Sequence, residues 1–130
     1  MSVHEAREDD VKPGDAVFFN TGWGSFWLKD NARYNRGEPG PGEEVARWMV
    51  ERQILVAGAD SWAVEAVPSP DPKLVFPVHG ELIAKNGIHI HENLVFDGLL
   101  ADRKYQFVYI FCPVPMKGAT GSPGGPIAVT

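Results

Sequence analysis

The chain has 130 residues, the length of about one ordinary domain. Its hydrophobic content of 44% and charged content of 22% are typical of a globular protein and argue against a disordered or fibrous chain. The formal net charge is −5 and no basic stripe occurs, which argues against nucleic acid as a partner.

The N-terminal third holds one predicted strand and one long loop. Residues 1–12 are charged and carry no period, which is typical of either a short helix or a ragged terminus. A turn signal at Pro13-Gly14-Asp15 leads into the apolar run Ala16–Thr21, which predicts a buried strand. Residues 22–42 are rich in Gly, Asn, Arg and Pro, and a loop of this length in a compact domain is often functional.

The next segment predicts a helix followed by a second buried strand. The helix is expected over Glu43–Arg52, because apolar side chains recur there at helical spacing. Its apolar stripe consists of Val45, Trp48 and Met49. The apolar run Ile54–Ala59 is a strand candidate and ends at Asp60. Strand, helix and strand in this order indicate a parallel βαβ crossover, and a polar residue after such a strand is well placed to face a site.

A second helix is expected over Pro77–Asn86, with Gly87 as its left-handed stop. The alternative is a hairpin turn at Asn86-Gly87. We favour the helix, because the residues before Asn86 do not alternate between apolar and polar. Ile88–His91 is then a short strand.

The C-terminal third predicts a strand over Tyr105–Cys112 and a Gly- and Pro-rich loop over residues 118–126. Cys112 ends the apolar strand, which indicates a buried, inert thiol. As the single cysteine it cannot form an internal disulfide, which favours a reducing, cytoplasmic location. No apolar run approaches the roughly 20 residues of a membrane span, and the polar first residues are not those of a signal peptide.

Three histidines and several carboxylates gather in the middle of the sequence. His79, His89 and His91 fall in a short window, Glu92 follows at once, and Asp60 and Glu65 lie upstream. Histidine with carboxylate is a ligand set for zinc, manganese or iron. No His-Glu-x-x-His or paired-cysteine motif occurs, so the composition indicates a metal site and the spacing does not.

Ordinary structural roles account for the same residues. On a regular strand His89 and His91 share one face and can point to solvent, whereas Glu92 lies on the apolar face with Ile88 and Ile90. A carboxylate buried there needs a cation or hydrogen-bond donors, which a loop or a helix end can also supply. His79 at the start of a helix can be a surface or capping residue.

Aromatic residues concentrate in the long loop, where they can line a pocket for a planar substrate. They can equally form a small core of the loop itself or a subunit contact. The candidate substrate-binding residues among them are Trp23, Trp27 and Tyr34.

A series of short blocks follows in a fixed order after residue 12. They are Pro13-Gly14-Asp15 with Thr21-Gly22-Trp23, Val56–Glu65, Phe76-Pro77-Val78-His79, Leu82-Ile83, Asn86-Gly87-Ile88, Glu92-Asn93-Leu94, Lys117–Pro123 and Pro126-Ile127-Ala128. In this order they resemble the cyclase family of metal-dependent hydrolases, which includes bacterial kynurenine formamidase, an enzyme of tryptophan catabolism, and isatin hydrolase.

The resemblance implies a swivelling β/β/α fold, an α/β class with a mixed sheet and few helices, usually in dimers or larger oligomers. His79 and Glu92 match the C-terminal metal ligands of the family, which implies a divalent metal, zinc or manganese. His89 and His91 fall where the family usually has apolar or aromatic residues, so they are expected not to be ligands.

The sequence departs from the family at its N-terminal side. The family motif His-x-Gly-Thr-His-x-Asp is absent, and the only upstream histidine is His4. The chain therefore resembles the C-terminal half of the family alone, one cyclase-like domain over residues 1–130. Catalytic metals normally have three protein ligands, so we expect a separate N-terminal half or a second copy to complete the site.

The function implied is metal-dependent hydrolysis of a small amide, with water attacking a formamide or lactam carbonyl as in an arylformamidase. The alternative is a non-catalytic family member that acts as an oligomeric scaffold or a small-molecule binder. The sequence identifies no residue of proton transfer and leaves the substrate open.

Overall fold

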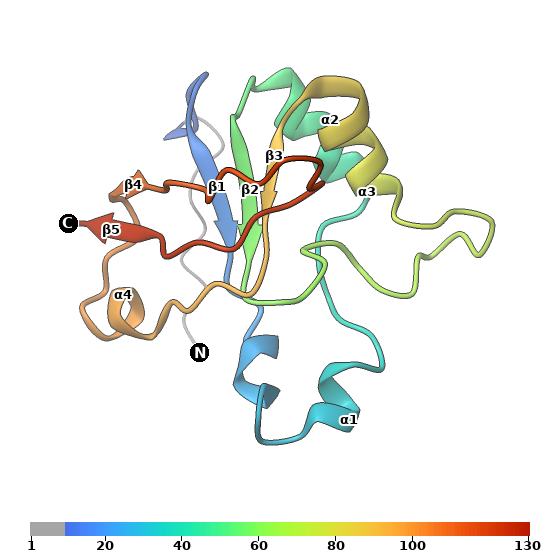
Figure 1. Ribbon diagram of the computed structural model, residues 1–130, viewed down its shortest axis with the longest axis horizontal. Helices are drawn as coiled ribbons and strands as arrows, with labels where there is room; N and C mark the ends of the chain where they lie inside the picture. Colours follow the sequence, from blue (N-terminus) through green and yellow to red (C-terminus); the bar gives the residue numbers. More distant parts are fainter. Residues whose placement is uncertain (1–9) are drawn as a thin grey trace. The chain divides into compact units, whose positions relative to one another are not determined.

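The computed structural model describes residues 10–130, and the two alternatives for residues 1–12 stay open because residues 1–9, with His4, lie outside this part. The chain divides after Phe96 into two compact units, each described below by itself (Figure 1). None of the helices in the described part has the length and apolar character needed to cross a membrane.

The N-terminal unit is built on a three-stranded parallel sheet in the order β1 (Ala16–Phe19), β2 (Val56–Ala59), β3 (His89–His91). The register pairs Phe19 with Ala59 and Gly58 with His91. The carboxyl ends of parallel strands lie at the same edge of a sheet, so the residues after β2 and after β3 leave the sheet side by side. The predicted βαβ crossover is confirmed.

The helices α2 (Glu43–Glu51) and α3 (Pro77–His79) pack with β2 in the core of this unit. The chain continues from α3 into the π-helical turn η3 (Gly80–Lys85) and stops at Gly87, whose φ of 67° is left-handed. The predicted helix over Pro77–Asn86 is therefore confirmed and the hairpin turn is not formed. The buried core residues are Ala46, Met49, Ile54, Ala57, Val78, Leu82 and Ile88.

The loop between β1 and α2 carries two short helices, η2 (Trp23–Phe26) and α1 (Asn31–Tyr34). The side chain of Asp30 caps α1 by accepting a hydrogen bond from the Arg33 N–H. Ring contacts join Trp23 to Phe26 and Trp27 to Tyr34, with centroids 5.1 and 5.2 Å apart. The loop thus has a small aromatic core of its own.

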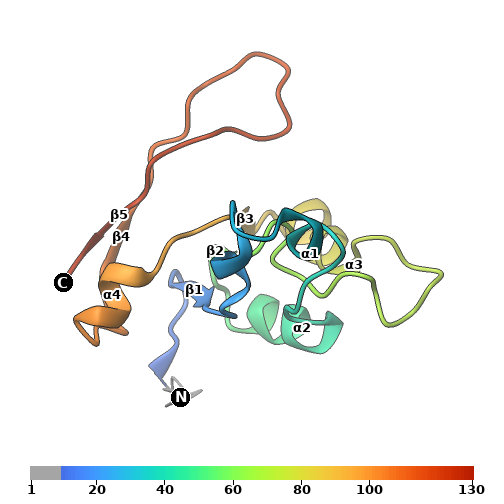
Figure 2. The ribbon, with the colours of Figure 1, turned by 90° about the horizontal axis from the view of Figure 1, so that it is seen from below.

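The C-terminal unit, Asp97–Thr130, begins with α4 (Asp97–Ala101) and contains an antiparallel ribbon of β4 (Val108–Ile110) and β5 (Ile127–Val129) (Figure 2). The strand predicted over Tyr105–Cys112 forms only in its middle. The prediction of a buried Cys112 is wrong: the strand ends before it, and its thiol is exposed. Across both units the chain is an α/β protein with few helices, as predicted.

Candidate functional site

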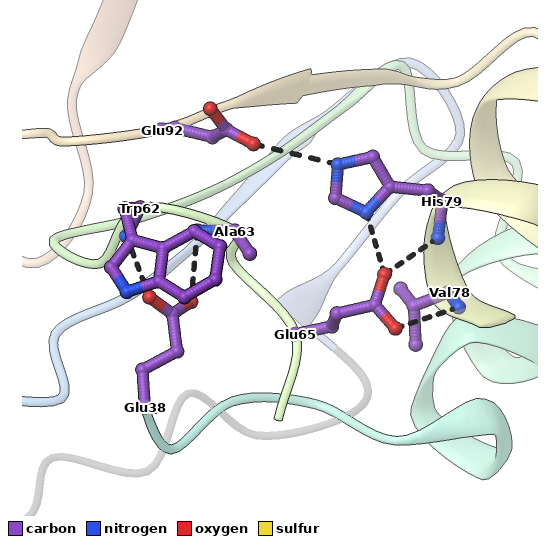
Figure 3. Close-up of polar contacts among 7 residues, drawn as sticks. All are labelled: Glu38, Trp62, Ala63, Glu65, Val78, His79 and Glu92. Carbon is purple, nitrogen blue, oxygen red and sulfur yellow. Dashed lines mark hydrogen bonds and ion pairs between the residues drawn. The ribbon is translucent and has the colours of Figure 1, made fainter. Parts of the chain in front are cut away.

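The side chain of His79 lies between two carboxylates (Figure 3). Its Nδ1 is 2.5 Å from Oε1 of Glu65, and its Nε2 is 3.4 Å from Oε1 of Glu92. His79 is the last residue of α3, Glu92 directly follows β3, and Glu65 lies in the loop after β2. Three elements that are separate in the sequence therefore bring these groups together at one end of the sheet.

Glu65 is 1% exposed, and its carboxylate binds the first turn of α3 as well as the imidazole ring. Oε2 accepts a hydrogen bond from the Val78 N–H at 3.1 Å, and Oε1 accepts one from the His79 N–H at 2.9 Å. These amides have no partner within the helix, because the first N–H groups of any helix lack one. Nδ1 of His79 thus faces Glu65, while Nε2 faces Glu92.

Glu92 is less buried than the sequence indicated. A carboxylate on the apolar face of a strand was expected, but β3 ends at His91 and the Glu92 side chain is 38% exposed. The hydrogen bond to Glu92 raises the pKa of His79, while burial lowers it and Glu65 adds to the increase. The two carboxylates therefore favour a positive charge, a proton or a metal cation, at this imidazole.

The loop that carries Glu65 has a strained turn. The Glu65 N–H donates to the Ala63 carbonyl at 2.6 Å, and Val64 between them has a φ of 62°. A three-residue turn with positive φ is the rare and strained γ-turn, and a β-branched residue is poorly suited to it. Such strain costs about 1–3 kcal/mol and persists only where the surroundings impose it.

Glu38 is one of the groups that impose this loop conformation. Its side chain is buried, and its two oxygens accept hydrogen bonds from the N–H groups of Trp62 and Ala63 at 2.8 and 2.9 Å (Figure 3). Burial raises the pKa of the Glu38 carboxyl, although these backbone hydrogen bonds partly offset the increase. The Glu38 backbone also pairs with Val67 beyond the loop.

Tyr34 connects the aromatic loop to the residue after Glu92. Its carbonyl accepts hydrogen bonds from the indoles of Trp23 and Trp62, at 3.2 and 3.1 Å. Its hydroxyl donates to Oδ1 of Asn93 at 2.5 Å, and Asn93 has a left-handed φ of 57°. Tyr34 thereby holds the chain where it turns immediately after Glu92.

The candidate substrate-binding residues have three different environments. Trp23 borders a hollow of about 800 Å³ together with Arg33 and Arg36. Trp27 is 54% exposed, and Tyr34 is buried. Their contact with a substrate stays a prediction.

The other histidines of the window and Asp60 have different surroundings. His89 is exposed, and burial lowers the pKa of His91. Asp60, at the end of β2, accepts hydrogen bonds from the N–H and hydroxyl of Thr21 and from the N–H of Gly24, so it fixes the start of the aromatic loop. Within residues 10–130, no group of three or more His, Cys, Asp or Glu side chains is arranged to hold a metal ion.

Sequence reasoning noted Glu65 without giving it a role and did not single out Glu38. The available signal for Glu65 was a lone carboxylate inside the otherwise apolar run Ala63–Val67, which must find donors when buried. For Glu38, in a Gly- and Pro-rich loop, the sequence offered no comparable signal.

Comparison with known proteins identifies the family of this chain and a similar solved structure. Residues 2–66, half of the chain, match the sequence model of the family described as "Putative cyclase", and the chain belongs to this family. The crystal structure of a novel cyclase is similar to this chain with 29% sequence identity and a TM-score of 0.77, over 92% of this chain. The match covers 41% of that structure, so the chain spans less than half of its length. A search of curated proteins found no match.

Proposed function

We propose that this chain supplies His79 and Glu92 to the divalent-metal site of an amide hydrolase of the arylformamidase type. Membership of the cyclase family supports the proposal, and the observation that carries it is the approach of the two side chains. Nε2 of His79 and Oε1 of Glu92 lie 3.4 Å apart at the end of the sheet. Both are ligand types of zinc and manganese.

The separation of these two atoms fits a shared metal ion. Zinc binds imidazole nitrogen at about 2.0–2.1 Å and carboxylate oxygen at about 2.0–2.2 Å, usually with tetrahedral geometry. Two such donors at a tetrahedral angle lie roughly 3.4 Å apart, the distance found between His79 and Glu92. Glu65 fits the role of an outer partner, because metal-binding histidines commonly donate their other ring N–H to a carboxylate.

In the proposed reaction, water adds across the C–N bond of a small amide and releases a carboxylic acid and an amine. A divalent cation, when bound, supplies a Lewis acid that polarises the carbonyl and acidifies water. His79 contributes its Nε2 lone pair, and Glu92 contributes negative charge that favours the cation. Glu65 keeps the imidazole from rotating, since it binds both the ring and the backbone of His79.

His79 and Glu92 do not complete a metal site by themselves. His79 and Glu92 provide two donors, whereas a hydrolytic zinc site normally has three protein ligands and one open position. We therefore propose that a second copy of this chain or a separate N-terminal half completes the site. Trp23, which borders the hollow, and the exposed Trp27 are proposed to bind the planar part of the substrate, with the buried Tyr34 holding the loop that carries them.

Calorimetric titration with zinc and manganese, paired with hydrolysis of a simple aryl formamide, tests the proposal. His79→Asn and Glu92→Gln should each weaken metal binding at least tenfold and lower the rate, whereas His89→Asn, an exposed histidine on β3, should change neither. Equal binding by all variants would overturn the ligand assignment. Wild-type protein that binds metal is assayed over a range of protomer concentrations and with a separate N-terminal half of the family added. If it hydrolyses no formamide under any of these conditions, the hydrolase function is excluded and the non-catalytic role is favoured.

A further inference from the structure

We propose that Glu65 is a positioning residue that fixes the tautomer of His79. In this role it keeps the hydrogen on Nδ1 and leaves Nε2 as the only ring atom open to a cation. The consequence for metal binding rests on the proposed function, but the tautomer itself is a property of the metal-free chain. The inference is carried by the contacts of the Glu65 carboxylate and by the rigidity of the loop that presents it.

The contacts of Glu65 set both the rotation and the protonation of the ring. Oε1 accepts from the backbone N–H of His79 and also lies 2.5 Å from Nδ1 of the same residue. A carboxylate offers Nδ1 no hydrogen, so the neutral ring is stable against Glu65 only with the hydrogen on Nδ1. A half-turn of the ring about its Cβ–Cγ bond would put Cδ2 where Nδ1 lies and would break this contact with Glu65.

The carboxylate cannot easily move to suit another tautomer. It is 1% exposed, and its Oε2 is held by the Val78 N–H. A Cβ on Gly40 would lie only 2.0 Å from the Val64 carbonyl oxygen, so the two backbones are in close contact. The strained turn at Val64 and the hydrogen bonds from the loop to Glu38 add to this constraint.

A purely structural role for Glu65 is the competing explanation. The bonds to the Val78 and His79 amides would stabilise the start of α3 whatever the ring did. The two explanations differ in one observable, because only the positioning role makes the site of the ring hydrogen depend on residue 65.

Long-range ¹H–¹⁵N NMR of the metal-free chain, at a pH where His79 is neutral, measures which ring nitrogen bears the hydrogen. Wild-type protein should show the Nδ1–H form. Glu65→Gln should largely keep the Nδ1–H form, because the glutamine oxygen at the Oε1 position can still accept from the backbone N–H and the ring Nδ1–H of His79. Glu65→Ala should lose the preference, and Ile54→Ala, which opens a cavity elsewhere in the core, should keep it and control for lost stability.

Two results would overturn the inference: an Nε2–H form in wild-type protein, or an unchanged tautomer in Glu65→Ala. Zinc titration of the same variants separates this inference from the proposed function. Glu65→Ala should weaken zinc binding roughly 10–100-fold, as loss of an outer-shell partner typically does, while Ile54→Ala should not. If the tautomers behave as expected but no variant binds zinc, the proposed function fails and the positioning role stands.

Discussion

Glu65 and His79 are joined twice, since one carboxylate oxygen of Glu65 accepts from the backbone N–H of His79 and also lies 2.5 Å from its ring Nδ1. The two residues are 14 positions apart in the sequence and come from different elements. The double contact ties the start of α3 to the orientation of the ring. A change at either residue should therefore affect both fold stability and the site.

Replacing Glu65 by alanine should lower the free energy of unfolding by about 1–3 kcal/mol, the usual cost of leaving buried hydrogen-bond donors without a partner. The donors concerned are the N–H groups of Val78 and His79. Urea denaturation measures the change. Glu51→Ala, an exposed glutamate at the end of α2, is the control and should have a much smaller effect; equal losses in both variants would contradict the account.

Alanine at Gly40 should displace the loop that carries Glu65. Its Cβ would lie 2.0 Å from the Val64 carbonyl oxygen and 2.6 Å from the carbonyl carbon of Glu65, and both are backbone atoms that cannot simply rotate away. We expect lower stability together with a changed ¹⁵N shift of the His79 ring. Gly42→Ala is the matched control, because a Cβ there meets nothing within 4 Å. Equal effects of the two substitutions on the His79 ring would contradict the role of this contact.

Glu38 should make a pH-dependent contribution to stability. Burial raises the pKa of its carboxyl in the folded state, so the folded protein binds this proton more tightly than the unfolded chain does. Its contribution is then most favourable at low pH and falls as the pH rises from the ordinary glutamate pKa through the raised one. Glu38→Gln should remove this part of the decline in stability. The measurement is the urea midpoint of wild type minus that of the variant at each pH across pH 3–8, roughly the range in which shifted carboxyls titrate.

The control for that series is Glu44→Gln, which removes an exposed carboxyl from the first turn of α2. Its difference curve against wild type should lack the decline assigned to Glu38. The stability of wild type minus that of Glu38→Gln measures the contribution of Glu38. If this difference instead rose with pH, the folded state would favour the ionised carboxylate, and burial would not be the dominant effect.

Removing the Tyr34 hydroxyl should loosen the turn after Glu92. Tyr34→Phe keeps the buried ring but deletes the hydrogen bond to Asn93, which is 59 positions away in the sequence. The expected loss is about 1 kcal/mol of stability, with faster amide exchange at Asn93 and Leu94. Unchanged exchange at these two residues would show that the hydroxyl does not hold the turn.

Much of the fold could be predicted from the sequence because its signals are local. The apolar stripe of Glu43–Glu51 and the apolar runs on either side determine the βαβ unit, and Gly87 ends the second helix as expected. Burial was predicted less well where strands end early. Cys112 and Glu92 both lie just beyond a strand, and both are more exposed than their apolar neighbours indicated.

The candidate site could be predicted only in part. The family resemblance pointed to His79 and Glu92, and the structure brings their side chains within 3.4 Å. The supporting carboxylates could not be assigned, because Glu38 binds residues 24 and 25 positions away and Glu65 binds residues 13 and 14 positions away. Such contacts depend on tertiary packing, and no local pattern of residue types encodes them.

Anomalous diffraction from crystals of the zinc-loaded chain would test the central claim most directly. The account predicts one zinc peak within about 2.0–2.2 Å of both Nε2 of His79 and a carboxylate oxygen of Glu92, with Glu65 still bonded to Nδ1. A zinc ion bound elsewhere, or ordered crystals in which Nε2 of His79 donates to Glu92 and no zinc lies between them, would contradict it.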